Sequence, residues 1–422
     1  MHSVTNAIPT GTIASIPAKA HAHRALICAA LATSPSTILL SRTSKDIDAT
    51  MDSLRSLGAH VVYENKIVTV TPGPAPAKGN VVPHESGTTL RLLLPVAASI
   101  CNDVDVDAKG RLPDRPLEPM LGEMKAHGVT FSQDKPPFTM TGRLQGGNFS
   151  MVGDVSSQFF SGLLLAAPQI GLSTITSTTP LQSSDYVTLT TETMRDFGVE
   201  VEHTLPDTNI NEAFTVPFGA SFIGRDNYQI EGDWSNAAIW MVAAGMTGKP
   251  ITITGMNKNS VQADRRIMQV MIDAGCDVVW DGMNVTVTGR ASKPIHADLE
   301  QMPDMLPVMA ALACSISGES SFIKGARLRL KESDRLIAVA NLVRDLGGTV
   351  REEGDDLYII GSGILKGGHG DCVNDHRLVM AGTLMALISE NPVTLQDSEA
   401  ITKSYPDFFE DWNLLGGNAQ PV

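Results

Sequence analysis

The chain has 422 residues, and its 46 Asp and Glu outnumber its 32 Lys and Arg to give a formal net charge of −14. So much negative charge argues against general binding to nucleic acid or anionic membranes, so any anion site must be built locally from a few Arg and Lys side chains. The longest apolar runs, such as 92–101 and 159–167, are too short to span a bilayer.

The cysteines favour a reducing compartment. They are five in number, lie far apart and show neither zinc-ligand nor redox spacing: Cys28, Cys101, Cys276, Cys314 and Cys372. We expect them to be buried free thiols, which favours a cytoplasmic protein. The first residues, MHSVTNAIPTG, also lack the basic and apolar segments of a secretion signal.

A helix followed by a glycine recurs six times along the chain, and two short strands follow the glycine in the first five copies. The marker glycines follow one another at steps of 70, 70, 77, 72 and 69 residues: Gly58, Gly128, Gly198, Gly275, Gly347 and Gly416. Repeats of this length are complete αβ units that need neighbours to cover their apolar faces. Because helices and strands alternate throughout, the pattern predicts an α/β fold.

The two ends of the chain bear on the domain organisation. The sixth copy shows no strand signal after its glycine, whereas residues 11–16 (GTIASI) form a predicted strand without a neighbour. We therefore expect the N-terminus to supply a strand to the last copy. Six copies in 422 residues predict two domains of three copies each, since one ordinary core would not cover this length. The predicted boundaries are 1–17 plus 230–422 for a discontinuous domain with both termini, and 18–229 for an inserted domain.

Polar segments precede several apolar helices. In chain order these segments are 17–24 before a helix at 25–31, 85–91 before 92–98, 156–158 before 159–166, 331–335 before 336–346, and 374–377 before 378–387. A helix N-terminus presents free N–H groups and the positive end of a dipole, so phosphate or carboxylate binds there readily. Cationic side chains in such segments would strengthen the binding.

Each segment also has a simpler interpretation. Ser or Asp ahead of a helix is most often only an N-cap. His21 and His23 have no acidic or cysteine partner at ligand spacing, so core packing or solvent exposure is expected rather than a metal site. No Gly-Lys-Ser/Thr follows Gly87, and the chain has neither GxSxG nor a GxGxxG that opens a helix, so ordinary nucleotide and serine-hydrolase chemistry has little support.

Nine short motifs follow one another along the chain. They are PAKAHAHR at 17–24, ESGTTLR at 85–91, RLPDRP from 111, VSSQF at 155–159, SSDY from 183, MPD at 302–304, KESDR at 331–335, NDHR at 374–377 and TKSYPDF from 402. Together and in this order they resemble the 5-enolpyruvylshikimate-3-phosphate synthase family of enolpyruvyl transferases. KESDR, NDHR and VSSQF carry most of the specificity.

The resemblance implies a two-domain enolpyruvyl transferase fold, with three βαβαββ units related by pseudo-threefold symmetry in each domain and an active site in the cleft between the domains. It implies transfer of the enolpyruvyl group of phosphoenolpyruvate to the 5-hydroxyl of shikimate 3-phosphate, with release of phosphate. It also implies no metal, no organic cofactor, no nucleic acid or membrane partner, and a monomer.

By the same resemblance, Asp304 is the base on the 5-hydroxyl, and Glu332 or Lys19 transfers a proton at the methylene carbon. The other residues implied to bind the two substrates are Arg24, Gly87, Arg111, Ser156, Ser157, Gln158, Ser183, Lys331, Arg335, Arg377 and Lys403. Lys19 and Asp304 are included in both sets. The choice between Glu332 and Lys19 stays open at this point.

Four residues depart from the family pattern. Ala18 and Ala20 replace two serines that flank the first lysine, Glu85 adds negative charge beside an anion site, and Arg327 stands where Asn is usual. These departures leave two alternatives open: a diverged transferase with another acceptor alcohol, and a non-catalytic anion-binding protein. A UDP-N-acetylglucosamine 1-carboxyvinyltransferase is disfavoured, because that family has a reactive cysteine where this chain has none.

Overall fold

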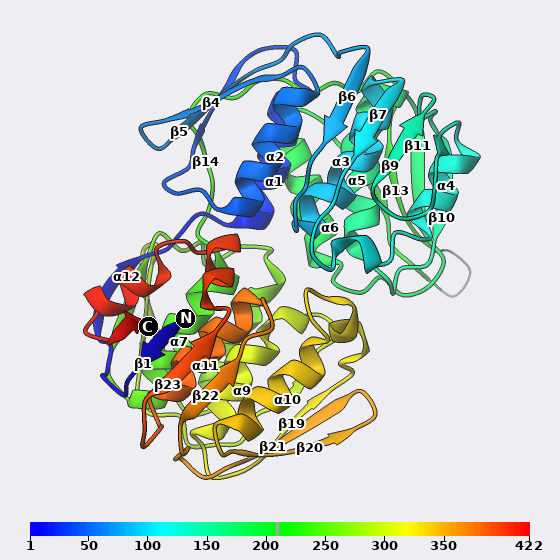
Figure 1. Cartoon of the computed structure of the whole chain (residues 1–422). Helices are drawn as coiled ribbons and strands as arrows, with labels where there is room; N and C mark the ends of the chain where they lie inside the picture. The colour runs from blue at the N-terminus through cyan, green and yellow to red at the C-terminus, as the bar shows by residue number, and fades with distance from the viewer. Residues whose placement is uncertain (208–210) are drawn as a thin grey trace. The chain divides into compact units, whose positions relative to one another are not determined.

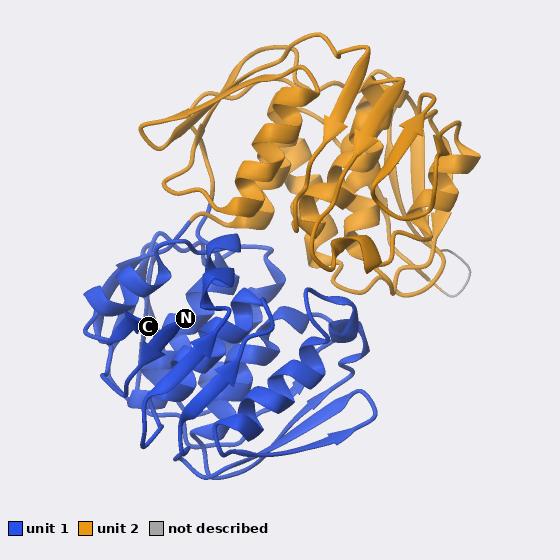
Figure 2. Cartoon of the chain, in the orientation of Figure 1, with its two compact units in different colours: residues 1–16, 231–422 blue, residues 17–230 orange. Residues whose placement is uncertain are grey.

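The computed structural model describes residues 1–207 and 211–422 and divides the chain into two compact units (Figure 2). Unit 1 comprises residues 1–16 and 231–422, and unit 2 comprises residues 17–230. The chain therefore leaves unit 1 after Ile16 and returns to it at Glu231.

Six four-stranded sheets share one strand order, three in each unit. The sheet of β18 (His296–Asp298), β19 (Gly318–Ile323), β21 (Asp356–Gly361) and β20 (Thr349–Glu353), for example, has a parallel first pair and two antiparallel pairs. With an α-helix after each of its first two strands, this sheet forms a βαβαββ unit, and the recurrence of the same strand order confirms the predicted α/β class and the six repeats. Strands such as β17 (Asn284–Thr288) alternate between more and less buried residues, because one face of each sheet is covered by helices.

The elements of unit 2 are α1 (Lys19–Ala30), β3 (Ser36–Leu39), α2 (Lys45–Ser56), β4 (His60–Glu64), β5 (Ile67–Thr71), β6 (Lys78–Val81), α3 (Gly87–Ile100), β7 (Asp103–Val106), η1 (Leu112–Asp114), α4 (Met120–Ala126), β8 (Thr130–Phe131), β9 (Phe138–Thr141), β10 (Gly147–Met151), α5 (Ser157–Ile170), β11 (Ser173–Ser177), α6 (Asp185–Asp196), β12 (Glu202–Thr204), β13 (Glu212–Val216) and β14 (Tyr228–Gln229).

The elements of unit 1 are β1 (His2–Val4), β2 (Gly11–Ala14), α7 (Trp234–Thr247), β15 (Ile251–Thr254), η2 (Ala263–Arg266), α8 (Ile267–Asp273), β16 (Asp277–Asp281), β17, β18 (His296–Asp298), η3 (Pro303–Met305), α9 (Leu306–Cys314), β19 (Gly318–Ile323), η4 (Ala326–Leu330), α10 (Arg335–Asp345), β20 (Thr349–Glu353), β21 (Asp356–Gly361), β22 (Gly368–Asp371), α11 (His376–Ala386), β23 (Val393–Gln396), η5 (Ser398–Lys403), α12 (Phe408–Leu414) and β24 (Ala419–Pro421).

The ends of the chain pair differently from the prediction. The N-terminus does supply a strand to the last repeat, but this strand is β1, which lies between β23 and β24. The predicted strand at 11–16 is β2, and it pairs with β15 in an earlier repeat of unit 1. The expectation that no strand follows Gly416 is also wrong, because β24 does. Three-residue strands carry no periodic signal, so only their partners define them.

Two helices begin five or more residues earlier than predicted. α1 begins at Lys19 rather than at residue 25, and α3 begins at Gly87 rather than at residue 92. The polar residues of α1 suggested a loop, yet alanine alternates with them and favours a helix. Most of α1 is buried, including His23 and Arg24, so its polar residues do not mark an exposed face. Lys19 and Arg24 therefore belong to a helix.

The marker glycines share a backbone conformation that explains their recurrence. All six have positive φ, between 86° and 108°, just after a helix end. This conformation closes helices and is open to glycine without strain. At Gly58 a Cβ would also come within 2.3 Å of the Pro74 carbonyl oxygen.

Each unit has its own core. In unit 2, α3 packs against α5, and in unit 1, α9 packs against α11 (Figure 1). Every residue of α9 is buried, as expected of a helix that is apolar all round. All five cysteines are buried and free, as predicted. None of the helices in the described part of the chain has the length and apolar character needed to span a bilayer.

Candidate active site

Asp304 lies among three cations of unit 1. It belongs to η3, and its Oδ1 lies 2.7 Å from Arg335 Nη1 and 3.3 Å from Lys331 Nζ. Arg377 Nη2 lies 3.7 Å from its other carboxylate oxygen. The Asp304 side chain keeps 19% of its surface exposed, so a small molecule can reach it within this unit.

Two of these cations, Arg335 and Arg377, stand at helix N-termini. α10 begins at Arg335 and is capped by Asp334, whose carboxylate accepts a hydrogen bond from the Ile337 N–H at 3.2 Å. α11 is capped by Asp375, which accepts from the Arg377 N–H at 3.0 Å. Each guanidinium therefore stands in the first turn of a helix, where the helix dipole already favours an anion.

Asp375 fixes Arg335. Its carboxylate is fully buried and accepts from Arg335 Nε at 2.9 Å, from Nη2 at 3.2 Å and from the Ser333 hydroxyl at 3.1 Å. Burial alone would lower the pKa of Arg335, but Asp375 and Asp304 raise it above its usual value. The guanidinium is therefore permanently charged and held in one orientation by two carboxylates.

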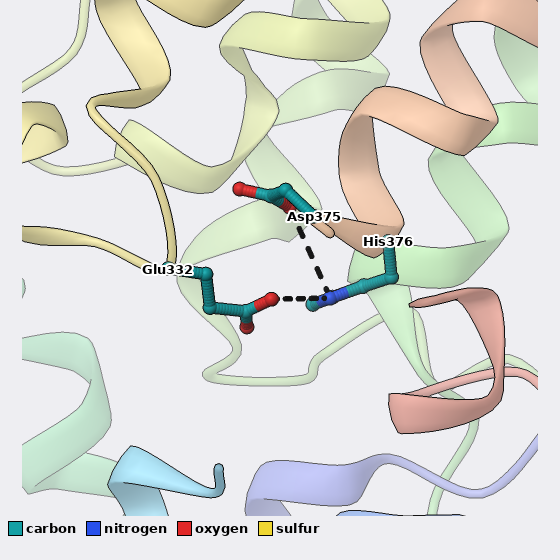
Figure 3. Close-up of side chains that lie close together, drawn as sticks. All are labelled: Glu332, Asp375 and His376. Atoms are coloured by element: carbon teal, nitrogen blue, oxygen red, sulfur yellow. Dashed lines mark hydrogen bonds and ion pairs between the residues drawn. The ribbon is translucent and has the colours of Figure 1, made fainter. Parts of the chain in front are cut away.

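Glu332 forms a second carboxylate centre with His376 (Figure 3). Its Oε2 lies 3.0 Å from His376 Nδ1, and that nitrogen lies 4.0 Å from Asp375 Oδ1. Lys403, the last residue of η5, places Nζ 4.0 Å from the same Glu332 oxygen and donates to the Asn374 carbonyl at 2.7 Å.

The trio of Glu332, Asp375 and His376 also meets a simple geometric criterion for a metal site, because possible ligand atoms lie within 4.8 Å of one another. The surrounding charge opposes this role. Arg335 already binds the Asp375 carboxylate, and Lys403 lies beside Glu332. A divalent cation would be repelled by both, so the trio is better suited to holding a proton than a metal.

Both candidate catalytic carboxylates are held in the ionised form. Burial alone would raise the pKa of Asp304, but the three cations around it hold the pKa well below its usual range. Burial alone would also raise the pKa of Glu332, and His376 is the main group that lowers it, with help from Arg335 and Lys403. An anion bound to these cations would weaken their effect and raise both pKa values.

A further carboxyl group, which the sequence did not single out, lies nearby. Asp264 in η2 is 1% exposed and accepts a short hydrogen bond from the Ser235 hydroxyl, while its Oδ1 has no hydrogen-bond partner among the described residues. Burial raises the pKa of Asp264 to about 6, with Arg377 lowering it and Asp304 raising it. Asp264 is therefore coupled electrostatically to the Asp304 cluster.

In unit 2, Lys19 is the first residue of α1 and pairs with Asp46 near the start of α2. Their Nζ and Oδ2 atoms lie 2.7 Å apart, and the side chains keep 18% and 11% of their surfaces exposed. The pair is thus near a surface that a ligand can reach. An incoming anion would compete with Asp46 for the ammonium group.

Arg24 is buried among neutral oxygen atoms. It is 1% exposed and donates to the Thr190 hydroxyl at 2.6 Å, the Ser161 hydroxyl at 3.2 Å, and the carbonyls of Ala20 and Tyr186 at 2.7 and 3.0 Å. Burial lowers the pKa of Arg24 to about 10, so it stays charged at neutral pH. Arg24 is therefore a fixed positive charge in the middle of α1.

The N-terminus of α3 lies beside two guanidinium groups. A Cβ at Gly87 would come within 2.6 Å of Arg115 Nη1 and 2.9 Å of Arg91 Nη1, so a side chain there would displace both. Gln158 accepts from Arg91 Nη1 at 3.1 Å and donates to the Thr88 hydroxyl at 2.9 Å. These contacts bring Gly87 and Gln158 together, with Arg91 between them.

The remaining candidates of unit 2 lie at the ends of elements. Ser156 caps α5, with its hydroxyl accepting from the Gln158 N–H at 3.3 Å, and the next residue, Ser157, is buried. Ser183 is 2% exposed and has a φ of +54°, a strained conformation for a non-glycine residue that is typical of functional loops. Arg111 precedes η1 and is exposed.

The structure thus brings the predicted residues of unit 1 into one cluster, whereas in the described part of unit 2 these contacts connect only Gly87, Ser156 and Gln158. The cluster in unit 1 is Asp304, Lys331, Glu332, Arg335, Arg377 and Lys403. Lys19, Arg24, Gly87, Arg111, Ser156, Ser157, Gln158 and Ser183 belong to unit 2. Sequence reasoning missed their partners Asp46, Arg91, Arg115, Asp264, Asp375 and His376. Arg91, Arg115, Asp375 and His376 lie inside the motifs quoted above, whereas nothing local marks Asp46 or Asp264.

Comparisons with known proteins agree along nearly the whole chain. The family model described as EPSP synthase (3-phosphoshikimate 1-carboxyvinyltransferase) matches residues 7–412. A similar protein from Clostridium kluyveri, named 3-phosphoshikimate 1-carboxyvinyltransferase, is 36% identical over 412 residues, covering 96% of this chain and 95% of that protein. One of the same name from Methanocorpusculum labreanum is 34% identical over 417 residues, covering 97% of each.

A solved structure supports the fold. The EPSP synthase of Acinetobacter baumannii aligns with a TM-score of 0.81 at 23% identity, covering 100% of this chain and 99% of that one. At this identity the likeness speaks for the fold, and it confirms the predicted enolpyruvyl transferase architecture.

Proposed function

Because the chain belongs to the EPSP synthase family, we propose that it transfers the enolpyruvyl group of phosphoenolpyruvate to the 5-hydroxyl of shikimate 3-phosphate and releases phosphate. This 3-phosphoshikimate 1-carboxyvinyltransferase reaction leads toward chorismate and the aromatic amino acids. The observation that carries the proposal is the pair of carboxylates: Asp304 lies among three cations, and Glu332 lies between His376 and Lys403.

The cations suit two substrates that together carry two phosphates and two carboxylates. We assign phosphoenolpyruvate to Gly87, Arg111, Gln158, Arg335, Arg377 and Lys403. We assign shikimate 3-phosphate to Arg24, Ser156, Ser157, Ser183, Asp304 and Lys331, with Lys19 touching both. Fixed cations that already stand in place stabilise developing negative charge without reorganising.

Asp304 is proposed to take the proton of the 5-hydroxyl group while the oxygen of that hydroxyl attacks C2 of phosphoenolpyruvate. Lys331, Arg335 and Arg377 hold the pKa of Asp304 well below its usual range, which is too low for an effective base. Substrate anions that bind these cations would raise this pKa. The base would therefore become effective only when both substrates are in place.

The methylene carbon must gain a proton during addition and lose one when phosphate leaves. Glu332 fits this role because it has His376 on one side and Lys403 on the other, so its charge state responds to bound anions. Lys19 is the alternative donor, and its ammonium group lies 2.7 Å from the Asp46 carboxylate. We favour Glu332, since a carboxyl group can both give and take this proton within the accessible pH range.

We also propose that the enzyme works as a monomer in the cytoplasm, with small-molecule substrates and without nucleic acid or membrane partners. The net charge of −14 and the five free cysteines support this part of the proposal.

The test is release of phosphate from phosphoenolpyruvate in the presence and absence of shikimate 3-phosphate, with a chelator added to remove free metal. The proposal expects release that depends on shikimate 3-phosphate, and an enolpyruvyl ether detected by mass spectrometry. Release with a different alcohol only would identify a diverged transferase. Binding of both ligands without turnover, under conditions where an authentic synthase is active, would identify a non-catalytic anion-binding protein.

A further inference from the structure

A chain of hydrogen bonds crosses the core of unit 2 from α1 to α3. His23 Nδ1 lies 2.7 Å from the Thr50 hydroxyl oxygen, which lies 2.7 Å from the Thr89 hydroxyl oxygen. The Thr89 hydroxyl in turn lies 2.8 Å from the Ser86 hydroxyl oxygen. His23, Thr50 and Thr89 are 0% exposed and Ser86 is 2% exposed. A buried and connected polar network specifies one arrangement of the helices that it joins.

The far end of this chain reaches the candidate binding groups. Ser86 caps α3 by accepting from the Thr89 N–H at 3.2 Å, and the next residue is Gly87. The Thr89 hydroxyl also lies 3.3 Å from the backbone oxygen of Asp46, whose carboxylate binds Lys19. The chain therefore joins the positions of Gly87 and of the Lys19–Asp46 pair.

The protonation state of His23 determines which group donates in each hydrogen bond of this network. Burial, together with Lys19 and Arg24, holds the pKa of His23 well below its usual value, so the ring is neutral and carries one N–H. Its Nε2 is buried without a hydrogen-bond partner among the described residues. An unpaired buried N–H is rarer than an unpaired acceptor. We therefore assign the hydrogen to Nδ1, which donates it to Thr50.

The direction of these hydrogen bonds determines whether Ser86 accepts or donates at the other end of the network. When His23 donates, Thr50 donates to Thr89, and Thr89 donates onward to Ser86 or to the Asp46 carbonyl. The Ser86 oxygen can then accept from Thr89 while its own hydrogen remains outside the chain. If His23 accepted instead, every hydroxyl would turn round, and Ser86 would have to donate back into the core.

We propose that His23 is a positioning residue for phosphoenolpyruvate: by donating to Thr50 it orients the hydroxyl chain that holds the Ser86–Gly87 turn beside the Lys19–Asp46 pair. His23 itself touches neither substrate in this inference, which rests on the proposed function. This positioning role differs from a packing role, because it depends on a hydrogen-bond donor at the Nδ1 position rather than on side-chain volume.

Three substitutions separate the two roles. His23→Asn keeps an N–H donor near the Nδ1 position, His23→Gln moves the amide to the Nε2 position, and His23→Leu removes the donor while keeping apolar volume. One neutral hydrogen bond corresponds to roughly 2- to 10-fold in a binding constant. We expect His23→Leu and His23→Gln to raise KM for phosphoenolpyruvate by that factor and to keep kcat within twofold of wild type. His23→Asn should keep both KM and kcat within twofold of wild type.

Thr50→Val breaks the same chain one link further and leaves His23 intact. It should raise KM to a similar extent, and the double variant with His23→Leu should be no worse than either single variant, because both remove one connected unit. Equal KM in all variants would overturn the inference. The inference would also be overturned if KM rose in all three His23 variants in proportion to their loss of melting temperature, because that result indicates a packing role.

A readout without substrate separates this inference from the proposed function. Hydrogen exchange in a peptide spanning 84–90 should become faster in His23→Leu and His23→Gln and remain as in wild type in His23→Asn. Wild-type protein without turnover would reject the proposed function, whereas unchanged exchange in all three variants would reject the role of His23.

Discussion

Asp264 offers a quantitative test of the electrostatics of unit 1. Its carboxyl group is buried in η2 with one hydroxyl partner, Ser235, and its pKa is raised to about 6 from a usual value near 3.8. About two pKa units correspond to roughly 2–3 kcal/mol between the two protonation states. Because the folded state holds this proton more tightly than the unfolded chain, the contribution of Asp264 to the free energy of unfolding should fall as pH rises from about 4 to about 7.

The substitution Asp264→Asn removes this titration and leaves a neutral group of the same shape. We expect the free energy of unfolding of the variant, relative to wild type, to increase by about 2 kcal/mol between pH 4.5 and pH 7.5. Any constant cost of the amide near Ser235 or Arg377 shifts the whole curve and does not change its slope. The slope with pH, rather than one value, is therefore the test.

Tryptophan fluorescence in a urea titration reports on the correct unit. The chain has 4 tryptophans, and Trp234, Trp240, Trp280 and Trp412 all belong to unit 1. The matched control is Asp273→Asn, which neutralises an exposed carboxylate of the same unit and should show no such slope. A difference between Asp264→Asn and wild type that stays constant with pH would refute the raised pKa and the coupling to the Asp304 cluster.

Four further substitutions test the site. Asp304→Asn should lower kcat about 100- to 10,000-fold while calorimetry shows shikimate 3-phosphate still bound, and near-normal turnover would remove Asp304 as the base. Arg111→Ala should raise KM for phosphoenolpyruvate about 10- to 100-fold, as expected for one charge-assisted contact, and an unchanged KM would contradict its assignment. Ala20→Ser should increase the affinity for shikimate 3-phosphate by up to about 100-fold in calorimetry and leave the affinity for phosphoenolpyruvate nearly unchanged. Equal affinities of the variant and wild type for shikimate 3-phosphate would mean that the first turn of α1 has adapted to alanine. Asp375→Ala should destabilise unit 1 by about 3–5 kcal/mol, because it leaves a buried guanidinium without its main partner, and a tryptophan-monitored loss below about 1 kcal/mol would mean that Asp304 alone suffices.

Much of the architecture could be read locally. The marker glycines recur because each follows a helix in a left-handed conformation that other residues adopt only with strain, so backbone sterics leave a visible trace in the sequence. Strands such as β17 were recognisable for a related reason, since the alternation of its residues reflects one covered face. The candidate site was recognisable mainly from its motifs, because KESDR and NDHR each open a helix N-terminus.

Other features depend on residues far apart in the chain, and no local pattern could decide them. β1 and β24 are three residues long, so only their pairing with each other and with β23 makes them strands. The start of α1 was hidden because its polar residues, His23 and Arg24, are buried by neighbouring helices rather than exposed in a loop.

The sequence by itself therefore determined the repeats, the fold class and the chemical inventory of the site. Tertiary structure alone decided how that inventory is paired. Arg335 lies between Asp304 and Asp375 only because elements separated by tens of residues pack together. The same packing buries the Asp264 carboxyl group beside Ser235 and excludes water from it. A charge in water behaves in nearly the same way wherever it stands in a sequence. Its pKa and its partners change only when folding removes the water and brings distant groups within a few ångströms.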